Sequence, residues 1–233
     1  MILIFLSLVS LGGIFACLLR PFHPDNTRIF ARIFSWGGAM ILGLKIRCHN
    51  FASLRNIGPC VYIVNHQHNL DLIVCGRVVA KRTVTVGKKS LRFLPFFGQL
   101  YWLAGNIFVD RKNQTRSRDT ISSSTRSLTK KNTSIWVFAE GTRNRGRNLL
   151  PFKKGAFVMA IDAGVPIVPI CVSSYPLYMN LRKLRSGVAD IRILPPVMTD
   201  KLTRANIDSL MTQCWEKMKE NIAAMDQEVY AMS

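Results

Sequence analysis

Apolar and polar residues divide the chain into an apolar start and an alternating remainder. Residues 1–19 carry no charged side chain, and a helix of that length would measure about 28 Å, close to the ~30 Å hydrocarbon core of a bilayer. After a turn at 20–26, residues 27–44 are again apolar but hold Arg28 and Arg32, four positions apart. We expect a membrane-embedded two-helix hairpin, with these arginines at the level of the lipid phosphates. A single transmembrane anchor followed by a buried helix is the alternative.

Beyond residue 44, short apolar runs alternate with longer segments of helical period. Strands are predicted at 45–48, 60–64, 83–86, 106–109, 134–138, 167–172 and 189–194. Helices are predicted at 69–80, 94–103, 113–130, 153–163 and 202–230. This alternation predicts an α/β fold in which a mixed, largely parallel sheet is flanked by helices. We therefore divide the chain into a membrane-associated segment, 1–44, and one α/β domain, 45–233.

The excess of basic residues indicates an anionic binding partner. The chain has 233 residues, with 32 Lys+Arg against 13 Asp+Glu and a net charge of +19, yet its mean hydropathy is positive, +0.16. Residues 1–100 hold twelve Lys/Arg and only two acids, so the charge adjoins the apolar start. The sequence has no zinc-finger or RNA-binding signature, so we expect anionic membrane lipids and no nucleic acid. The basic residues after Arg20 predict that the α/β domain faces the cytoplasm.

The six cysteines, at positions 17, 48, 60, 75, 171 and 214, show no metal-ligand spacing. Three of them lie in apolar runs, which is typical of buried, reduced thiols. We therefore expect no structural metal and no disulfide framework.

A polar turn after the second predicted strand carries the first candidate chemistry. His66 would lie in the turn and Asp71 in the first turn of the next helix, so the chain can fold back and bring the two side chains together. A carboxylate there would fix the imidazole tautomer and leave the other nitrogen free to accept a proton. Two alternatives remain open at this point. Asn65 or Asn69 could simply cap the helix, or His68 could be the base or share a metal with His66.

Two further strands end in polar residues at the same predicted edge. One ends in Asp110 and Arg111, an acid–base pair in which the guanidinium could bind a phosphate. The other ends in the run Glu140-Gly141-Thr142-Arg143. A glycine there allows close backbone approach, and the arginine can bind phosphate. A surface ion pair and a solvated basic turn are the alternatives for these two segments.

The order and spacing of these segments resemble the glycerolipid acyltransferases, in particular the lysophosphatidic acid acyltransferase family. The four motifs of that family, N-H-x4-D, G-x-I-F-x-D-R, F-P-E-G-T-R and V-P-I-V-P, are matched at residues 65–71, 105–111, 138–143 and 165–169. The chain departs from the pattern at three positions. Ala139 replaces a proline, which we expect to loosen the third loop. Asn144 and His68 stand where serine is common, and the role of His68 is unexplained.

The resemblance implies an enzyme and a mechanism. His66 would be the general base for the sn-2 hydroxyl of lysophosphatidic acid, and Asp71 would orient it. The activated oxygen would attack the thioester of acyl carrier protein or acyl-coenzyme A directly, so no cofactor is needed. The product would be phosphatidic acid in phospholipid biosynthesis, made by a catalytic domain at 45–233 on the cytoplasmic face of the inner membrane. Another lysophospholipid or glycerol 3-phosphate is the alternative acceptor, and a non-enzymatic anionic-lipid binding protein is the distant alternative.

The resemblance also assigns substrate-binding residues. Lys88, which follows the third predicted strand, is added to the candidate residues of the second and third motifs. The set that would place the phosphate of the lysolipid is Lys88, Arg111, Glu140, Gly141, Thr142 and Arg143.

Overall fold

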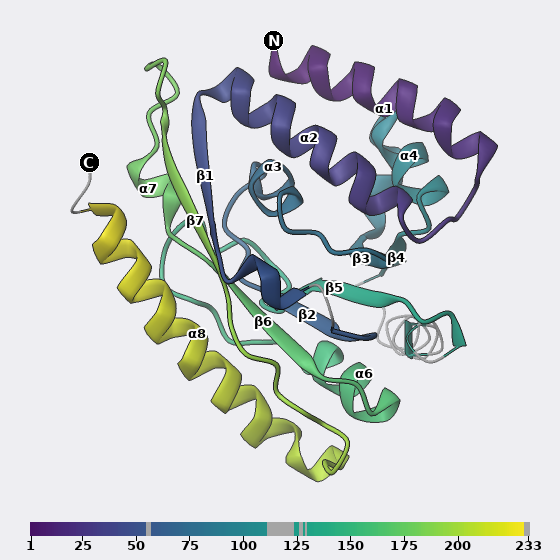
Figure 1. Cartoon of the computed structure of the whole chain (residues 1–233), viewed down its shortest axis with the longest axis vertical. Coiled ribbons are helices and arrows are strands. Elements are labelled where there is room, and N and C mark those ends of the chain that lie inside the picture. Colours follow the sequence, from purple (N-terminus) through teal and green to yellow (C-terminus); the bar gives the residue numbers. More distant parts are fainter. Residues whose placement is uncertain (55–56, 111–123, 126–127, 129, 231–233) are drawn as a thin grey trace.

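A computed structural model describes residues 1–54, 57–110, 124–125, 128 and 130–230 (Figure 1). Seven strands form one sheet in the order β1-β7-β6-β2-β5-β3-β4. Their bounds are β1 Leu44–His49, β2 Val61–Val64, β3 Thr83–Lys88, β4 Ile107–Val109, β5 Ser134–Phe138, β6 Ile167–Val172 and β7 Gly187–Ile193. Neighbouring strands pair in parallel except β6 and β7, which are antiparallel. The predicted mixed, largely parallel sheet and all seven predicted strands are confirmed.

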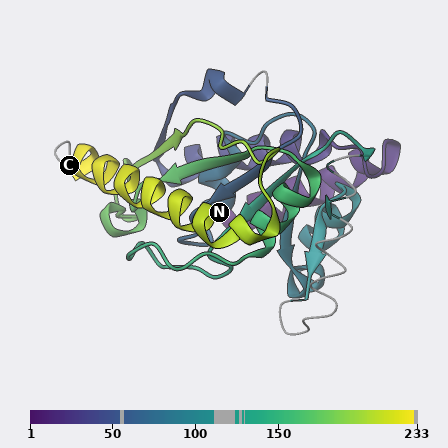
Figure 2. The same cartoon turned by 90° about the horizontal axis from the view of Figure 1, so that it is seen from below.

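Helices cover both faces of this sheet. Their bounds are α1 Ile2–Leu19, α2 Asn26–Leu42, α3 Asp71–Gly76, α4 Phe97–Leu103, α6 Gly155–Ala163, α7 Tyr175–Tyr178 and α8 Ile207–Tyr230. Successive residues of β2 alternate between two cores: Val61 and Ile63 pack in the core that includes α6 and α8, and Tyr62 and Val64 in the core that includes α2 and α3. Figure 2 shows α8 in front of the sheet and α1 behind it. The all-apolar run of β2 therefore reflects burial on both faces.

Helix bounds agree less well with the sequence prediction. The helix expected over 69–80 is only the short α3, and the one expected from 202 begins at Ile207, after a 3-10 turn at Arg204–Asn206. α7 was not predicted, because four residues that include a proline carry no helical period. The helix expected over 113–130 lies largely outside the described residues.

The first two helices lie where the sequence predicted a hairpin. α1 packs through the small residues Ser10, Gly13 and Cys17, with Gly13 directly against Leu100 of α4. Its opposite face leaves large apolar side chains exposed, namely Leu3, Ile4, Leu8, Phe15, Leu18 and Leu19. In the described part of the chain, α1 is the one helix long and apolar enough to cross a membrane. The division of the chain at residue 44 stays a prediction.

One buried ion pair joins β1 to β7. The side chain of Asp190 on β7 is fully buried, and the Arg47 guanidinium on β1 donates to both of its carboxylate oxygens. His49 lies 3.8 Å from the same carboxylate. The hydrogen bonds to Asp190 raise the pKa of Arg47, because the carboxylate stabilises the guanidinium cation.

Replacing Arg47 by methionine should lower the free energy of unfolding by about 3 kcal/mol, because it leaves the buried Asp190 carboxylate without its bidentate partner. Thermal unfolding in detergent, followed by circular dichroism, measures the change. Arg204→Met is the matched control, because it breaks an exposed pair with Asp162 and should leave the melting temperature nearly unchanged. Equal melting temperatures for the two variants would show that the buried pair contributes nothing to stability.

Candidate active site

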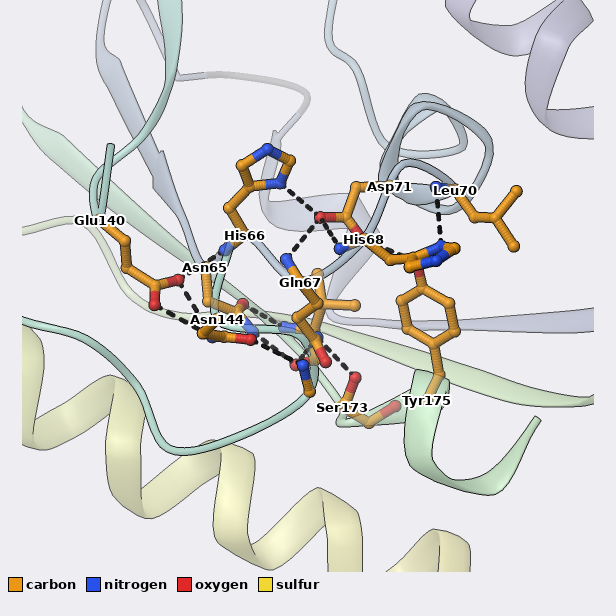
Figure 3. A network of polar contacts seen from close by, with 12 residues as sticks. Asn65, His66, Gln67, His68, Leu70, Asp71, Glu140, Asn144, Ser173 and Tyr175 are labelled. Carbon is orange, nitrogen blue, oxygen red and sulfur yellow. Dashed lines mark hydrogen bonds and ion pairs between the residues drawn. The ribbon is translucent and has the colours of Figure 1, made fainter. Parts of the chain in front are cut away.

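His66 and Asp71 meet at the carboxyl end of β2. His66 lies in the turn two residues after β2, and Asp71 is the first residue of α3. The His66 Nδ1 atom lies 2.6 Å from the Asp71 Oδ2 atom (Figure 3). The predicted fold-back of the chain is confirmed. A carboxylate accepts only from a protonated nitrogen, so the proton of a neutral imidazole lies on Nδ1 and the Nε2 atom is left as a base.

Asp71 is held by four donors. Its side chain is buried, and its Oδ2 atom also accepts hydrogen bonds from the backbone N–H groups of Gln67, at 2.7 Å, and His68, at 3.1 Å. The Tyr175 hydroxyl donates to Oδ1 at 2.7 Å. Burial raises the pKa of the Tyr175 phenol well above its usual range, and the Asp71 carboxylate raises it further, so this hydroxyl stays a donor. The carboxylate can therefore not rotate away from His66 without losing several hydrogen bonds.

The His66 ring is fixed from one face and open on its edge. Phe138, the last residue of β5, stacks on it with ring centroids 4.1 Å apart. The side chain is 18% exposed. The second ring nitrogen points away from Asp71 in Figure 3, and no hydrogen bond to it is found within the described residues. This nitrogen is therefore not occupied by a partner among the described residues.

Glu140 and Asn144 join the loop after β5 to the turn that holds His66. The Glu140 carboxylate is buried and accepts hydrogen bonds from the backbone N–H groups of His66, at 2.6 Å, and Leu150, at 2.9 Å. The Asn144 amide donates to both carboxylate oxygens, and its backbone N–H donates to the His66 carbonyl. Burial raises the pKa of the Glu140 carboxyl, while these donors oppose the rise. In this arrangement Glu140 acts on the position of His66 through the backbone, and its contact with substrate stays a prediction.

Two amides of the first motif brace the turn against β6. The side chain of Asn65 donates to the Val172 carbonyl and accepts from the Val172 N–H, both at 2.8 Å. The Gln67 amide donates to the carbonyls of Val172 and Ser173. Asn65 therefore binds the neighbouring strand and does not cap α3, whose N-terminus has no side-chain cap. That alternative for Asn65 is wrong.

A backbone hydrogen bond holds the third loop at the position of the missing proline. The Ala139 N–H donates to the Val64 carbonyl at 3.1 Å, which a proline cannot do. This contact opposes the loosening that we expected from Ala139. Gly141 has a φ of +70°, a left-handed conformation that other residues adopt at a cost. The glycine is thus explained by the turn itself.

The predicted substrate residues that the structure describes lie at the same edge of the sheet. Lys88 is the last residue of β3, and Thr142 and Arg143 follow β5 on the surface. No contact of these three with the His66–Asp71 pair is found among the described residues, and Arg111 lies outside them. The Nδ1 atom of His68 accepts the Leu70 N–H. No cluster of three potential metal ligands occurs in the described ranges.

Sequence reasoning missed Tyr175, Gln67 and the bracing role of Asn144. Tyr175 lies 104 positions from its partner Asp71, so no local spacing connects them. Only the pairing of β2 with β6 brings their carboxyl ends together.

Comparisons with known proteins agree with this geometry. A model of the acyltransferase family matches residues 45–173, more than half of the chain. The 1-acyl-sn-glycerol-3-phosphate acyltransferase of Salmonella typhimurium is 43% identical over 97% of this chain and 92% of its own length. The Escherichia coli protein of the same name is 42% identical with the same coverage, and the human alpha form is 34% identical over 89% of this chain and 73% of its own.

A solved structure supports the fold. The crystal structure of a 1-acyl-sn-glycerophosphate acyltransferase from Thermotoga maritima superposes with a TM-score of 0.68, covering 87% of this chain and 79% of the other at 20% identity. The family model and the near-full-length relatives agree with this fold. This chain therefore belongs to the acyltransferase family, among the 1-acyl-sn-glycerol-3-phosphate acyltransferases.

Proposed function

We propose that this protein transfers an acyl group from a thioester to the sn-2 hydroxyl of lysophosphatidic acid and so makes phosphatidic acid for phospholipid biosynthesis. The observation that carries the proposal is the 2.6 Å contact between His66 Nδ1 and Asp71, which leaves the second imidazole nitrogen as a base at the open edge of the sheet. The names of the relatives support the acceptor, since each is called a 1-acyl-sn-glycerol-3-phosphate acyltransferase.

The chemistry needs one base and no covalent acyl-enzyme. The Nε2 atom of His66 takes the proton of the acceptor hydroxyl as its oxygen attacks the thioester carbonyl. Asp71 stabilises the resulting imidazolium. When the tetrahedral intermediate collapses, the carbon–sulfur bond breaks and the departing thiolate receives the proton from His66. The products are the new ester and a free thiol, and the thioester itself supplies the activation.

The cysteines support direct transfer. All six are free, and five are buried. Burial raises the pKa of the Cys60 thiol to about 11 and that of the Cys214 thiol to about 12, so neither is a thiolate at neutral pH. Neither of these two thiols is therefore suited to carry the acyl group.

Basic residues at the same edge suit the anionic substrates. Lys88 and Arg143, with Arg111, would bind the lysolipid phosphate, and Glu140, Gly141 and Thr142 would shape the loop beside it. The donor would be acyl carrier protein, which is acidic, or coenzyme A, which carries phosphates. The net charge of +19 supports either.

The apolar face of α1 supports a membrane location for the protein. Exposed leucine, isoleucine and phenylalanine side chains on one helix face are stable when covered by lipid. Charge next to this helix favours the cytoplasmic face of the inner membrane. The acceptor would then reach the site from the bilayer in which it is dissolved.

A panel of acceptors tests the proposed function. The purified protein in detergent is given a labelled acyl thioester, on either carrier, with lysophosphatidic acid, another lysophospholipid or glycerol 3-phosphate. We expect transfer to lysophosphatidic acid to be fastest. Faster transfer to either competitor would replace the proposed acceptor, and lipid binding without transfer to any acceptor would leave only a binding protein.

Tyr175→Phe tests whether the Tyr175 hydroxyl supports the His66–Asp71 pair by its hydrogen bond to Asp71. Removing the hydroxyl leaves the buried Asp71 Oδ1 atom without its donor, so we expect kcat to fall by about tenfold. A lower melting temperature with an unchanged kcat would make Tyr175 a structural residue only.

A further inference from the structure

The segment from α7 to β7 carries an unusual surface. Residues 177–185 lie beyond the part of the chain matched by the family model. Leu177, Leu181 and Leu184 are 59%, 56% and 98% exposed. Single exposed leucines are common, but these three lie within one short segment that also exposes three basic side chains, together with Tyr178 and Asn180. We call residues 177–185 the α7–β7 segment.

Three cations alternate with the leucines. Arg182, Lys183 and Arg185 are all exposed. None of them forms an ion pair with a carboxylate in the parts of the chain that the structure describes. The run Leu181-Arg182-Lys183-Leu184-Arg185 therefore offers apolar side chains and unneutralised positive charge at the same place.

The segment is fixed to the end of α2. The Ser186 N–H donates to the Gly43 carbonyl at 2.9 Å, and the Asn180 N–H donates to the Ser186 carbonyl at 2.7 Å, which closes the loop. A Cβ atom on Gly43 would lie 1.8 Å from the Leu184 carbonyl oxygen, so the glycine permits this close approach. Leu184 is thus held at a set position relative to the first two helices.

The segment lies at the same end of the molecule as the first two helices. In Figure 1 the α7–β7 segment, in green, rises to the same end of the molecule as α1. α2 ends beside it and exposes Trp36 and Met40, and α1 exposes its large apolar side chains. Elements from distant parts of the sequence that expose apolar side chains therefore lie at the same end of the molecule.

We propose that the α7–β7 segment is a second membrane-contact element, which docks on an anionic phospholipid surface next to α1. The leucines enter the boundary between headgroups and acyl chains, and the three cations bind lipid phosphates. This inference rests on the membrane setting of the proposed function. An acidic protein surface would pair with the cations but would leave Leu184 in water, so the mixed composition favours lipid.

A second membrane contact would fix how the active-site edge of the sheet faces the bilayer. β7 begins with Gly187, directly after the segment, and runs antiparallel to β6. Its start therefore lies beyond the carboxyl end of β6, at the edge of the sheet that carries His66. With α1 alone the domain could rotate about the helix axis, whereas two contacts fix the orientation of that edge toward the bilayer.

A fluorescent label measures the contact directly. Leu184→Cys is made with Cys48→Ser, because the other cysteines are buried, and is labelled with an environment-sensitive dye in the full chain. In vesicles containing anionic phospholipid we expect blue-shifted emission and quenching by brominated lipid. Met198→Cys is the matched control, since Met198 is 60% exposed but lies past the far end of β7. Water-like emission at position 184 in these vesicles would overturn the proposal.

A pair of aspartates measures the functional effect. We expect Leu181→Asp/Leu184→Asp to lower acyl transfer to lysophosphatidic acid in anionic vesicles by about tenfold and to leave transfer in detergent unchanged. Met198→Asp should change neither. Equal transfer in vesicles by the aspartate variant and the unmodified protein would contradict the proposal. A raised KM for the acyl carrier in detergent would instead assign the segment to the carrier protein.

The label also separates this inference from the proposed function. If the unmodified protein transfers no acyl group in detergent, the proposed function fails whatever the label shows. If transfer occurs but the label at position 184 stays in water, only the membrane contact fails.

Discussion

Replacing His66 by alanine should lower kcat for acyl transfer by about 10³-fold or more. The second imidazole nitrogen has no hydrogen-bond partner among the described residues and lies in the ring that stacks on Phe138, and alanine removes this base. Binding of the lysolipid should change little, because the ring makes no contribution to the phosphate site that we propose. Initial rates at saturating substrate, with KM determined in parallel, measure both effects.

His68→Ala is the matched control for this variant. His68 lies two positions away, but its ring accepts only the Leu70 N–H among the described residues, and its bond to Asp71 comes from the backbone. We expect the rate of this variant to stay near that of the unmodified protein. The roles would be reversed if His68→Ala lost activity and His66→Ala kept it.

Asp71→Asn should lower kcat by about 10²- to 10⁴-fold. The carboxylate has two oxygens, and each accepts hydrogen bonds from the surrounding donors. An asparagine side chain has only one oxygen, so its NH₂ group must face some of these donors. His66 Nδ1 and the Gln67 N–H share one oxygen, and the Tyr175 hydroxyl uses the other. The amide therefore loses at least one of these bonds, cannot stabilise an imidazolium by charge, and releases the His66 tautomer.

Asp226→Asn separates this chemistry from a general loss of structure. Asp226 is a partly buried carboxylate that accepts the Ser174 N–H, one residue before Tyr175, and does not touch His66. We expect this variant to melt at a lower temperature and to keep most of its rate. If both aspartate variants lost activity in proportion to their loss of stability, Asp71 would be a structural residue.

The fold was predictable because buried strands appear in the sequence as runs of apolar residues. Residues 61–64 read as an unbroken apolar run, and all four are buried between two helical layers. The placement of His66 was predictable for the same reason, since a polar turn after a buried parallel strand must lie at its carboxyl end. The 2.6 Å contact with Asp71 follows from only five positions of separation.

The supports of the site were not predictable, because they depend on strand order. Glu140 reads as a charged residue in a basic turn, yet it is buried and bonded to the His66 backbone across 74 positions. Tyr175 reads as one more aromatic residue after an apolar strand. Their roles depend on β5 and β6 flanking β2, which no spacing along the sequence reveals.

The measurement that tests the central claim most directly is the product of one reaction. The purified protein is incubated with 1-acyl lysophosphatidic acid and a thioester of a different, labelled acyl chain, and the lipids are resolved by mass spectrometry. The account predicts phosphatidic acid with the labelled chain at sn-2, no acyl adduct on the intact protein, and no product with His66→Ala. Free labelled fatty acid without phosphatidic acid, or an undiminished yield with His66→Ala, would contradict it.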